Sequence, residues 1–299
     1  MAVLFWGISY VWTTMAFEYY KPITVMLIRL VIATLLMYII FRARNLGEKV
    51  HRSDYKDFVI LSFFSPFCFF IGENFGLLHT SPTIAAVIIA TIPVFTPILG
   101  YVAFRERLSL INILGFLVSF AGVMIMVLDF EFRFSASPLG VFFLFFGVIS
   151  ALINIVFLKK LTLKYSSFTI IGVQNFLGIW FFLPVFLIMD YSHFITVRPS
   201  LQVVAALVAL AVFGSTLAFM FYTTAVRSIG IARTAIFANM IPVVTAITSF
   251  LILGEALDLS KIIGMVVVIC GLLMTQISRL RNRKKKQAAE YPVPGQKKE

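Results

Sequence analysis

Charged residues are scarce in this chain. Only 13% of its 299 residues are Asp, Glu, Lys or Arg, and 61% are hydrophobic. Soluble domains carry about 25% charged and about 45–50% apolar residues. A soluble protein of this length could not hide so much apolar side chain from water. The sequence therefore predicts an integral membrane protein with lipid as its main solvent.

Cysteine and histidine are also rare, with two and three residues. Cys68 and Cys270 both lie inside apolar segments, which argues against a disulfide framework and against a zinc site. The sequence contains neither a His-Glu-x-x-His motif nor a Walker A motif. We therefore expect no metal, no cofactor, no catalytic residues and no direct use of ATP. An intramembrane hydrolase would need a nucleophile–base pair or metal ligands.

Long polar stretches are missing until the tail. Ten apolar runs of near-spanning length follow one another, and the first begins directly after Met1, without the charged lead of a signal peptide. Backbone groups in lipid must be satisfied within the segment, so each run predicts a helix and the fold class is an all-α membrane protein. The runs are 2–17, 22–41, 58–78, 83–103, 110–128, 138–158, 167–189, 201–224, 233–253 and 262–278.

The positive charges lie mainly on one side of this predicted topology. With ten helices, 20 of the 25 Lys and Arg residues fall in the loops and the tail on the side of the two termini. Cytoplasmic loops carry such an excess, so both termini are predicted to be cytoplasmic. This topology explains the net charge of +12 without nucleic-acid binding. The basic tail, 279–299, is expected to be disordered.

The chain contains an internal repeat. Segment 83–123 aligns without gaps with 232–272 at a shift of 149, and 13 of the 41 positions are identical. Because the shift is half the chain length, we expect two five-helix repeats, 1–128 and 138–278. Five is odd, so the second repeat would enter the bilayer inverted. Inverted repeats are a common design of secondary transporters, with the solute site near the membrane midplane.

The repeated residues resemble the EamA repeat of the drug/metabolite transporter superfamily. Each copy has an alanine and a mid-helix proline, then Glu-x-Leu, then two glycines seven residues apart. Trp6-Gly7 and Leu27-Ile28-Arg29 are similar to the family as well. The residues of the two copies are Ala86, Pro93, Glu106, Leu108, Gly115 and Gly122, and Ala235, Pro242, Glu255, Leu257, Gly264 and Gly271.

This resemblance implies a ten-helix bundle in a bacterial plasma membrane. Such a transporter moves amino acids, metabolites or amphipathic drugs, often outward. Its partners would be the bilayer and a small organic solute, and both proton coupling and simple exchange stay open. A non-transporting scaffold or a channel is the alternative, although a channel more often shows rings of charge. The sequence carries no signal for an oligomeric state.

Two charges lie inside predicted helices. Arg29 and Glu73 lie at similar depths in consecutive antiparallel helices, and charges in lipid are functional candidates by default. We expect either an ion pair between them or proton uptake by Glu73 during coupling; a permanent structural bridge is the other interpretation. His79, at the end of the same helix as Glu73, could titrate or could simply touch lipid headgroups.

Polar and aromatic side chains within the runs are candidates for solute binding. Amides also join helices in lipid, and aromatic residues also form interface belts, so each has a structural alternative. The candidates are Trp6, Tyr10, Asn74, Asn154, Gln174, Asn175, Tyr222 and Asn239.

The repeated proline, glutamate and glycine residues have more local interpretations. Pro93 and Pro242 lie mid-helix and are hinge candidates, or sites of a static kink. Glu106 and Glu255 are expected to cap the helices that follow them. The paired glycines of each copy share a helix face and predict close helix packing.

Overall fold

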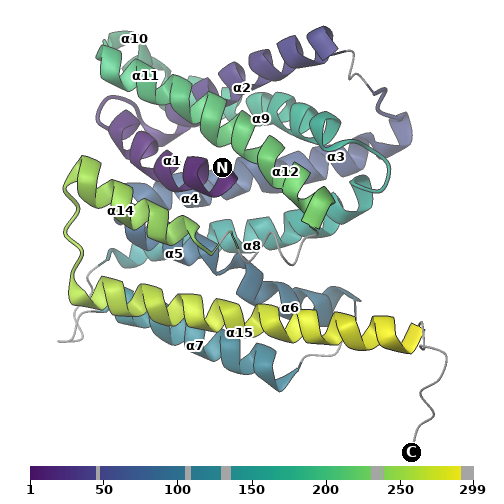
Figure 1. Cartoon of the computed structure of the whole chain (residues 1–299). Coiled ribbons are helices and arrows are strands. Elements are labelled where there is room, and N and C mark those ends of the chain that lie inside the picture. Colours follow the sequence, from purple (N-terminus) through teal and green to yellow (C-terminus); the bar gives the residue numbers. More distant parts are fainter. Residues whose placement is uncertain (45–47, 105–108, 129–135, 230–236, 238, 291–299) are drawn as a thin grey trace, which may run out of the picture.

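The computed structural model describes residues 1–44, 48–104, 109–128, 136–229, 237 and 239–290. Among these residues the structure is helical and has no β-strand, which agrees with the predicted fold class (Figure 1). The first half contains α1 (Ala2–Phe17), α2 (Pro22–Arg44), η1 (Arg52–Asp54), α3 (Tyr55–Ser62), η2 (Phe63–Cys68), α4 (Phe69–Leu78), α5 (Pro82–Ala90), α6 (Ile92–Phe104) and α7 (Leu110–Val127). The second half contains α8 (Pro138–Leu161), α9 (Ser167–Met189), α10 (Tyr191–Thr196), α11 (Leu201–Ala209), η3 (Leu210–Leu217), α12 (Ala218–Ile229), α14 (Ile241–Leu253) and α15 (Leu259–Glu290).

Six helical segments of the described chain are long and apolar enough to cross a membrane, and four shorter apolar helices accompany them. Large apolar side chains such as Ile188 and Leu201, each 85% exposed, face outward from these helices. Such surfaces are stable in lipid and costly in water. The chain is therefore a multi-pass helical membrane protein.

The tail differs from the sequence prediction. Helix α15 continues to Glu290, so the first part of the basic tail is helical and not disordered as expected. Lys, Arg, Gln and Ala favour helices intrinsically, and the next prolines are Pro292 and Pro294. Residues 291–299 lie outside the described chain.

The predicted fourth helix is interrupted. Helix α5 ends at Ala90, Thr91 forms a turn, and α6 begins at Ile92, so Pro93 is the second residue of a new helix and not mid-helix. Pro242 is likewise the second residue of α14. Proline is favoured at this position because its missing N–H needs no partner there. Each repeated Ile-Pro pair thus begins a helix, and in the first half the preceding helix α5 ends two residues before it.

Two π-helical segments occupy matching places in the two halves. Segment η2 covers 63–68, and adding the repeat shift of 149 gives 212–217, which lies within η3. Within η2, Ser65 leaves helical geometry with φ −150° and ψ 123°. π-Helical turns occur often at functional sites because they break the regular helix register.

Helices α7 and α15 pack through their repeated glycines and lie side by side in Figure 1. A Cβ placed on Gly271 would lie 2.6 Å from the carbonyl oxygen of Gly115, and one on Gly122 would lie 2.8 Å from that of Gly264. The first glycine of each copy therefore meets the second glycine of the other, so the two helices are antiparallel. The predicted close packing is confirmed.

Helices α2 and α9 are joined at both ends by carboxylates. Asp190, directly after α9, accepts hydrogen bonds from the backbone N–H of Thr24 (3.1 Å) and from its hydroxyl (3.0 Å) at the start of α2. Glu48, beyond the end of α2, accepts from the N–H of Ser166 (2.9 Å) and the hydroxyl of Thr169 (2.8 Å) at the start of α9. A carboxylate at a helix N-terminus accepts hydrogen bonds from unpaired N–H groups and interacts favourably with the positive end of the helix dipole.

Candidate functional site

A buried cation lies where four helical segments meet. Arg29 on α2 is 4% exposed, and its Nε donates a hydrogen bond to the hydroxyl of Ser215 in η3. Its guanidinium carbon lies 4.5 Å from the centre of the Phe70 ring on α4, within the range of a cation–π contact. The sequence pointed to Arg29 but not to Ser215, since small hydroxyl residues are common in apolar helices.

Glu73 on α4 belongs to the same cluster. One of its carboxylate oxygens accepts a hydrogen bond of 3.0 Å from the phenol of Tyr10 on α1. Glu73 and Arg29 interact electrostatically, but no pair of their atoms among the described residues lies within the 4.0 Å of an ion pair. The two groups therefore attract each other without the direct contact of an ion pair, and their predicted roles stay a prediction. Tyr10 and Ser215 take up the hydrogen bonds that the pair would have made.

The aromatic candidates lie beside this cluster. The indole N–H of Trp6 donates to the carbonyl of Gly214 (3.2 Å), the residue before Ser215. The ring of Trp6 packs against Tyr222 and Phe219 on α12, with ring centres 5.1 Å apart in both cases. Trp6 and Tyr222 therefore form an aromatic contact between α1 and α12, and Tyr10, also on α1, contacts Glu73 instead.

Asn74 is buried next to Glu73. Its side-chain nitrogen donates to the carbonyl of Phe70 (2.8 Å) and contacts the sulfur of Met26 (3.2 Å). Its side-chain oxygen is buried and has no hydrogen-bond donor among the described residues. A free buried acceptor costs about 1–3 kcal/mol, so Asn74 stays a candidate ligand.

Two predicted amides bind backbone instead. Gln174 donates to the carbonyl of Ser65 (2.8 Å), and Asn154 donates to that of Leu61 (2.9 Å). Both carbonyls lie at or beside the π-helical segment η2, where the regular ladder is broken. The two side chains compensate for this break, so we do not propose them as solute ligands. The sequence signal for the break was Pro66 in the middle of an apolar run.

The remaining candidates lie elsewhere. Asn175 is buried on α9 and its side-chain nitrogen has no partner among the described residues. Asn239 is 3% exposed in the turn before α14. His79 is exposed at the end of α4, beside Gly140. None of the three has a described contact with Arg29 or Glu73. Glu106 lies outside the described residues.

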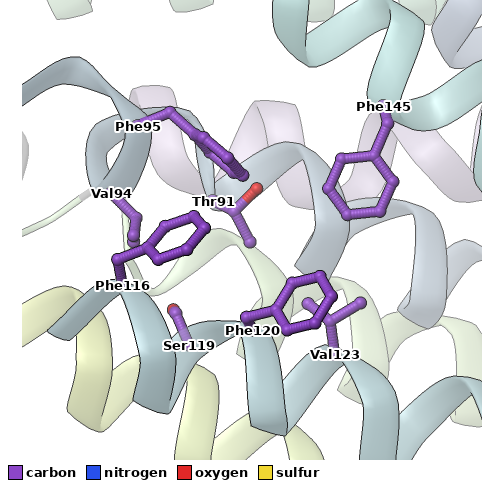
Figure 2. Close-up of a pocket in the computed structure, with 8 residues that line it drawn as sticks. All are labelled: Thr91, Val94, Phe95, Phe116, Ser119, Phe120, Val123 and Phe145. Carbon is purple, nitrogen blue, oxygen red and sulfur yellow. The ribbon is translucent and has the colours of Figure 1, made fainter. Parts of the chain in front are cut away.

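A small cavity between α6, α7 and α8 is apolar. Figure 2 shows the rings of Phe95, Phe116, Phe120 and Phe145 around it. The hydroxyl of one lining residue, Ser119, already donates to the carbonyl of Val268 (3.1 Å). This cavity has no free polar group to recognise a polar solute, so the charged cluster is the stronger candidate.

Glu255 joins the two halves at the side predicted to be outside. One carboxylate oxygen accepts hydrogen bonds from the hydroxyls of Thr83 (2.8 Å) and Ser249 (2.6 Å), and the other pairs with Lys261 (3.2 Å). Glu255 therefore contacts the start of α5 in the other half. Its described contact with the start of α15, the helix that follows it, is through the side chain of Lys261 and not, as expected, through backbone N–H groups. Gly254, left-handed with φ 66°, turns the chain back at the end of α14.

Replacing Glu255 by glutamine should lower the melting temperature, because it removes the charge that faces Lys261. Burial raises the pKa of Glu255, but hydrogen bonds from Ser249, Ser81 and Thr83 and the charge of Lys261 outweigh burial and lower it overall. A carboxyl with a lowered folded pKa stabilises the protein above its unfolded pKa of about 4.3, and this contribution is lost as the pH falls through the folded value.

The measurement is the melting temperature of the purified protein between pH 4 and 8, with the exposed Glu18→Gln as matched control. The difference between wild type and Glu255→Gln should be largest near neutral pH and shrink toward pH 4. Equal melting temperatures at pH 7 would contradict a stabilising role of this carboxylate.

The comparisons with known proteins cover nearly the whole chain. Residues 1–128 and 138–277 match the EamA-like transporter family. An uncharacterized transporter of Archaeoglobus fulgidus is 24% identical over 91% of this chain and 95% of its own length. The uncharacterized transporter YetK of Bacillus subtilis is 26% identical over 90% of this chain and 80% of its own length. A solved crystal structure at 15% identity has the same fold, with a TM-score of 0.67 over 94% of this chain and 95% of that one.

Proposed function

The chain belongs to the EamA-like transporter family and is a membrane transporter, and on that premise we propose that it is a secondary exporter of small organic solutes. The solutes would be amino acids, metabolites or amphipathic drugs, moved by alternating access between two inverted five-helix repeats. The observation that carries this proposal is the charged cluster of Arg29, Glu73 and Tyr10, buried where first-half helices meet η3 of the second half.

Two sets of contacts and one match in position support the inverted repeat. The glycines of α7 and α15 meet reciprocally, the N-termini of α2 and α9 are capped reciprocally, and the π-helical segments η2 and η3 coincide at the repeat shift. Each of these observations stays the same when the two halves are interchanged, as expected for a twofold axis between them. The six long apolar helices and the four shorter ones of the described chain equal in number the ten predicted runs, which supports the proposed ten-helix arrangement.

The ends of the helices support the orientation. Groups predicted to be outside contact each other, as Asp190 does with Thr24 and Glu255 with Thr83. Groups predicted to be inside do the same, as Lys164 does with Asp54 at 2.7 Å. With the excess of Lys and Arg on the side of 42–57, both termini would be cytoplasmic in the plasma membrane of a bacterium.

Glu73 is the proposed coupling group. Its carboxylate lies near α1 and α2, with a tyrosine as hydrogen-bond donor and Arg29 nearby. A carboxylate in such a place can take up a proton when the solute leaves. The half-helices that begin at Ile92 and Ile241 would supply the hinges, with Pro93 and Pro242 at their starts.

The proposal has a two-part test, beginning with topology. Cysteines replacing Lys49 and Arg198, which are exposed and related by the repeat shift, should react with an impermeant thiol reagent from opposite faces of the membrane. The background for both is the Cys68→Ala, Cys270→Ala double variant. Labelling of both sites from one face would refute inversion.

The second part measures transport itself. Purified protein in proteoliposomes should exchange at least one solute of a broad panel of amino acids and amphipathic amines faster than protein-free vesicles. Absence of flux for the whole panel, with a monodisperse folded protein, would favour a scaffold over a transporter.

A further inference from the structure

The guanidinium of Arg29 carries more hydrogen-bond donors than there are acceptors around it among the described residues. It carries five N–H groups, and its described contacts are the bond from Nε to Ser215, the ring of Phe70 and the electrostatic interaction with Glu73. Among the described residues, neither terminal nitrogen has a hydrogen-bond acceptor. A buried charge left this way is destabilising unless an anion or further acceptors compensate it.

The surroundings hold this group in a fixed orientation. Phe70 lies against the guanidinium, and Ser215 fixes Nε, so the plane of the fork is set from two sides. Position 214 is a glycine, so no side chain occupies the space beside the guanidinium; a Cβ built there would lie 3.7 Å from Nη2 of Arg29. A planar fork with both terminal nitrogens free matches the two oxygens of a carboxylate.

We propose that the terminal nitrogens of Arg29 bind the carboxylate of the transported solute. This inference rests on the proposed transport function and narrows its solute to small organic monocarboxylates, including zwitterions. Glu73 further restricts which solutes can bind. One of its carboxylate oxygens accepts a hydrogen bond from Tyr10, and the other has no partner among the described residues and could contact the rest of the solute. A second carboxylate placed there would be repelled, whereas a hydroxyl, an amine or an apolar group would be accepted.

The experiment compares matched pairs of probes in wild-type proteoliposomes. The probes are phenylalanine and phenylalaninamide, benzoate and benzamide, and the dicarboxylate succinate. The acid of at least one pair should be exchanged or should inhibit exchange, and its amide and succinate should not. If amides and acids compete equally, the assignment of Arg29 is overturned while transport stands; if no probe or panel solute moves, the transport proposal itself fails.

Variants of Arg29 then test whether this side chain is the group that binds the carboxylate. Arg29→Gln should weaken the apparent affinity for the acid by roughly 10- to 100-fold, the value of a charge-assisted bidentate contact. Arg29→Lys keeps the charge without the fork and should be intermediate. The control Arg198→Gln makes the same chemical change at an exposed site and should bind as wild type. If Arg29→Gln does not fold, the affinity of Arg29→Lys for the acid is the test. Wild-type affinity in that variant would overturn the bidentate contact.

Discussion

Replacing Gly271 with valine is expected to remove most of the folded protein. Any Cβ at this position would lie 2.6 Å from both the carbonyl oxygen of Gly115 and the amide nitrogen of Ser119. These are backbone atoms on α7, which cannot rotate away as a side chain can. Inserting extra methyl groups into a packed core destabilises a protein by about 1–3 kcal/mol. Because the contact here is with rigid backbone, we expect the destabilisation of Gly271→Val to lie at or above the upper end of that range.

The measurement is the yield of monodisperse protein in size-exclusion chromatography, together with its melting temperature. The control is Cys270→Val, which introduces the same residue one position away, on an exposed side of α15. We expect near wild-type yield for the control and a loss of more than half for Gly271→Val. Wild-type yield of both variants would show that α7 and α15 are not in close contact in the membrane.

Replacing Glu73 with glutamine is expected to abolish proton-driven accumulation while sparing exchange. Glutamine has the same shape, and its carbonyl can still accept the hydrogen bond from Tyr10, but it cannot carry a proton. Accumulation driven by a pH gradient should fall at least about 10-fold, a loss of roughly 1.4 kcal/mol of coupling or more. Counterflow without a gradient should stay within about 3-fold of wild type.

Both assays use a solute that the wild-type protein exchanges, with Glu18→Gln as the exposed control. Unchanged pH dependence in Glu73→Gln would remove Glu73 from coupling. A parallel fall of counterflow, accumulation and melting temperature would assign Glu73 a purely structural role.

The apolar runs predicted most of the helices because length and continuous hydropathy determine what lipid accepts. The predicted runs 2–17 and 167–189 match α1 and α9 to the residue, and 110–128 matches α7 within one. Short amphipathic or polar elements carry no such signal, so α10 at Tyr191–Thr196 was missed. Helix α15 was predicted too short because its polar end is stabilised by helix propensity and not by hydropathy.

The site could be predicted only in part. Charges in apolar runs identified Arg29 and Glu73, and their proximity followed from their places on neighbouring antiparallel helices. Their actual partners could not be predicted, since Ser215 reaches Arg29 only through the packing of η3 against α2. The roles of Asn154 and Gln174 likewise depend on a local break in another helix, which no periodicity in their own segments reveals.

The reciprocal caps of α2 and α9 have a mechanical consequence. Because Asp190 and Glu48 each tie the far end of one helix to the near end of the other, neither helix can slide or tilt alone without losing charge-assisted bonds. The two helices are thus held together at both ends. If the halves move against each other as proposed, α2 and α9 are expected either to move together or to break these bonds.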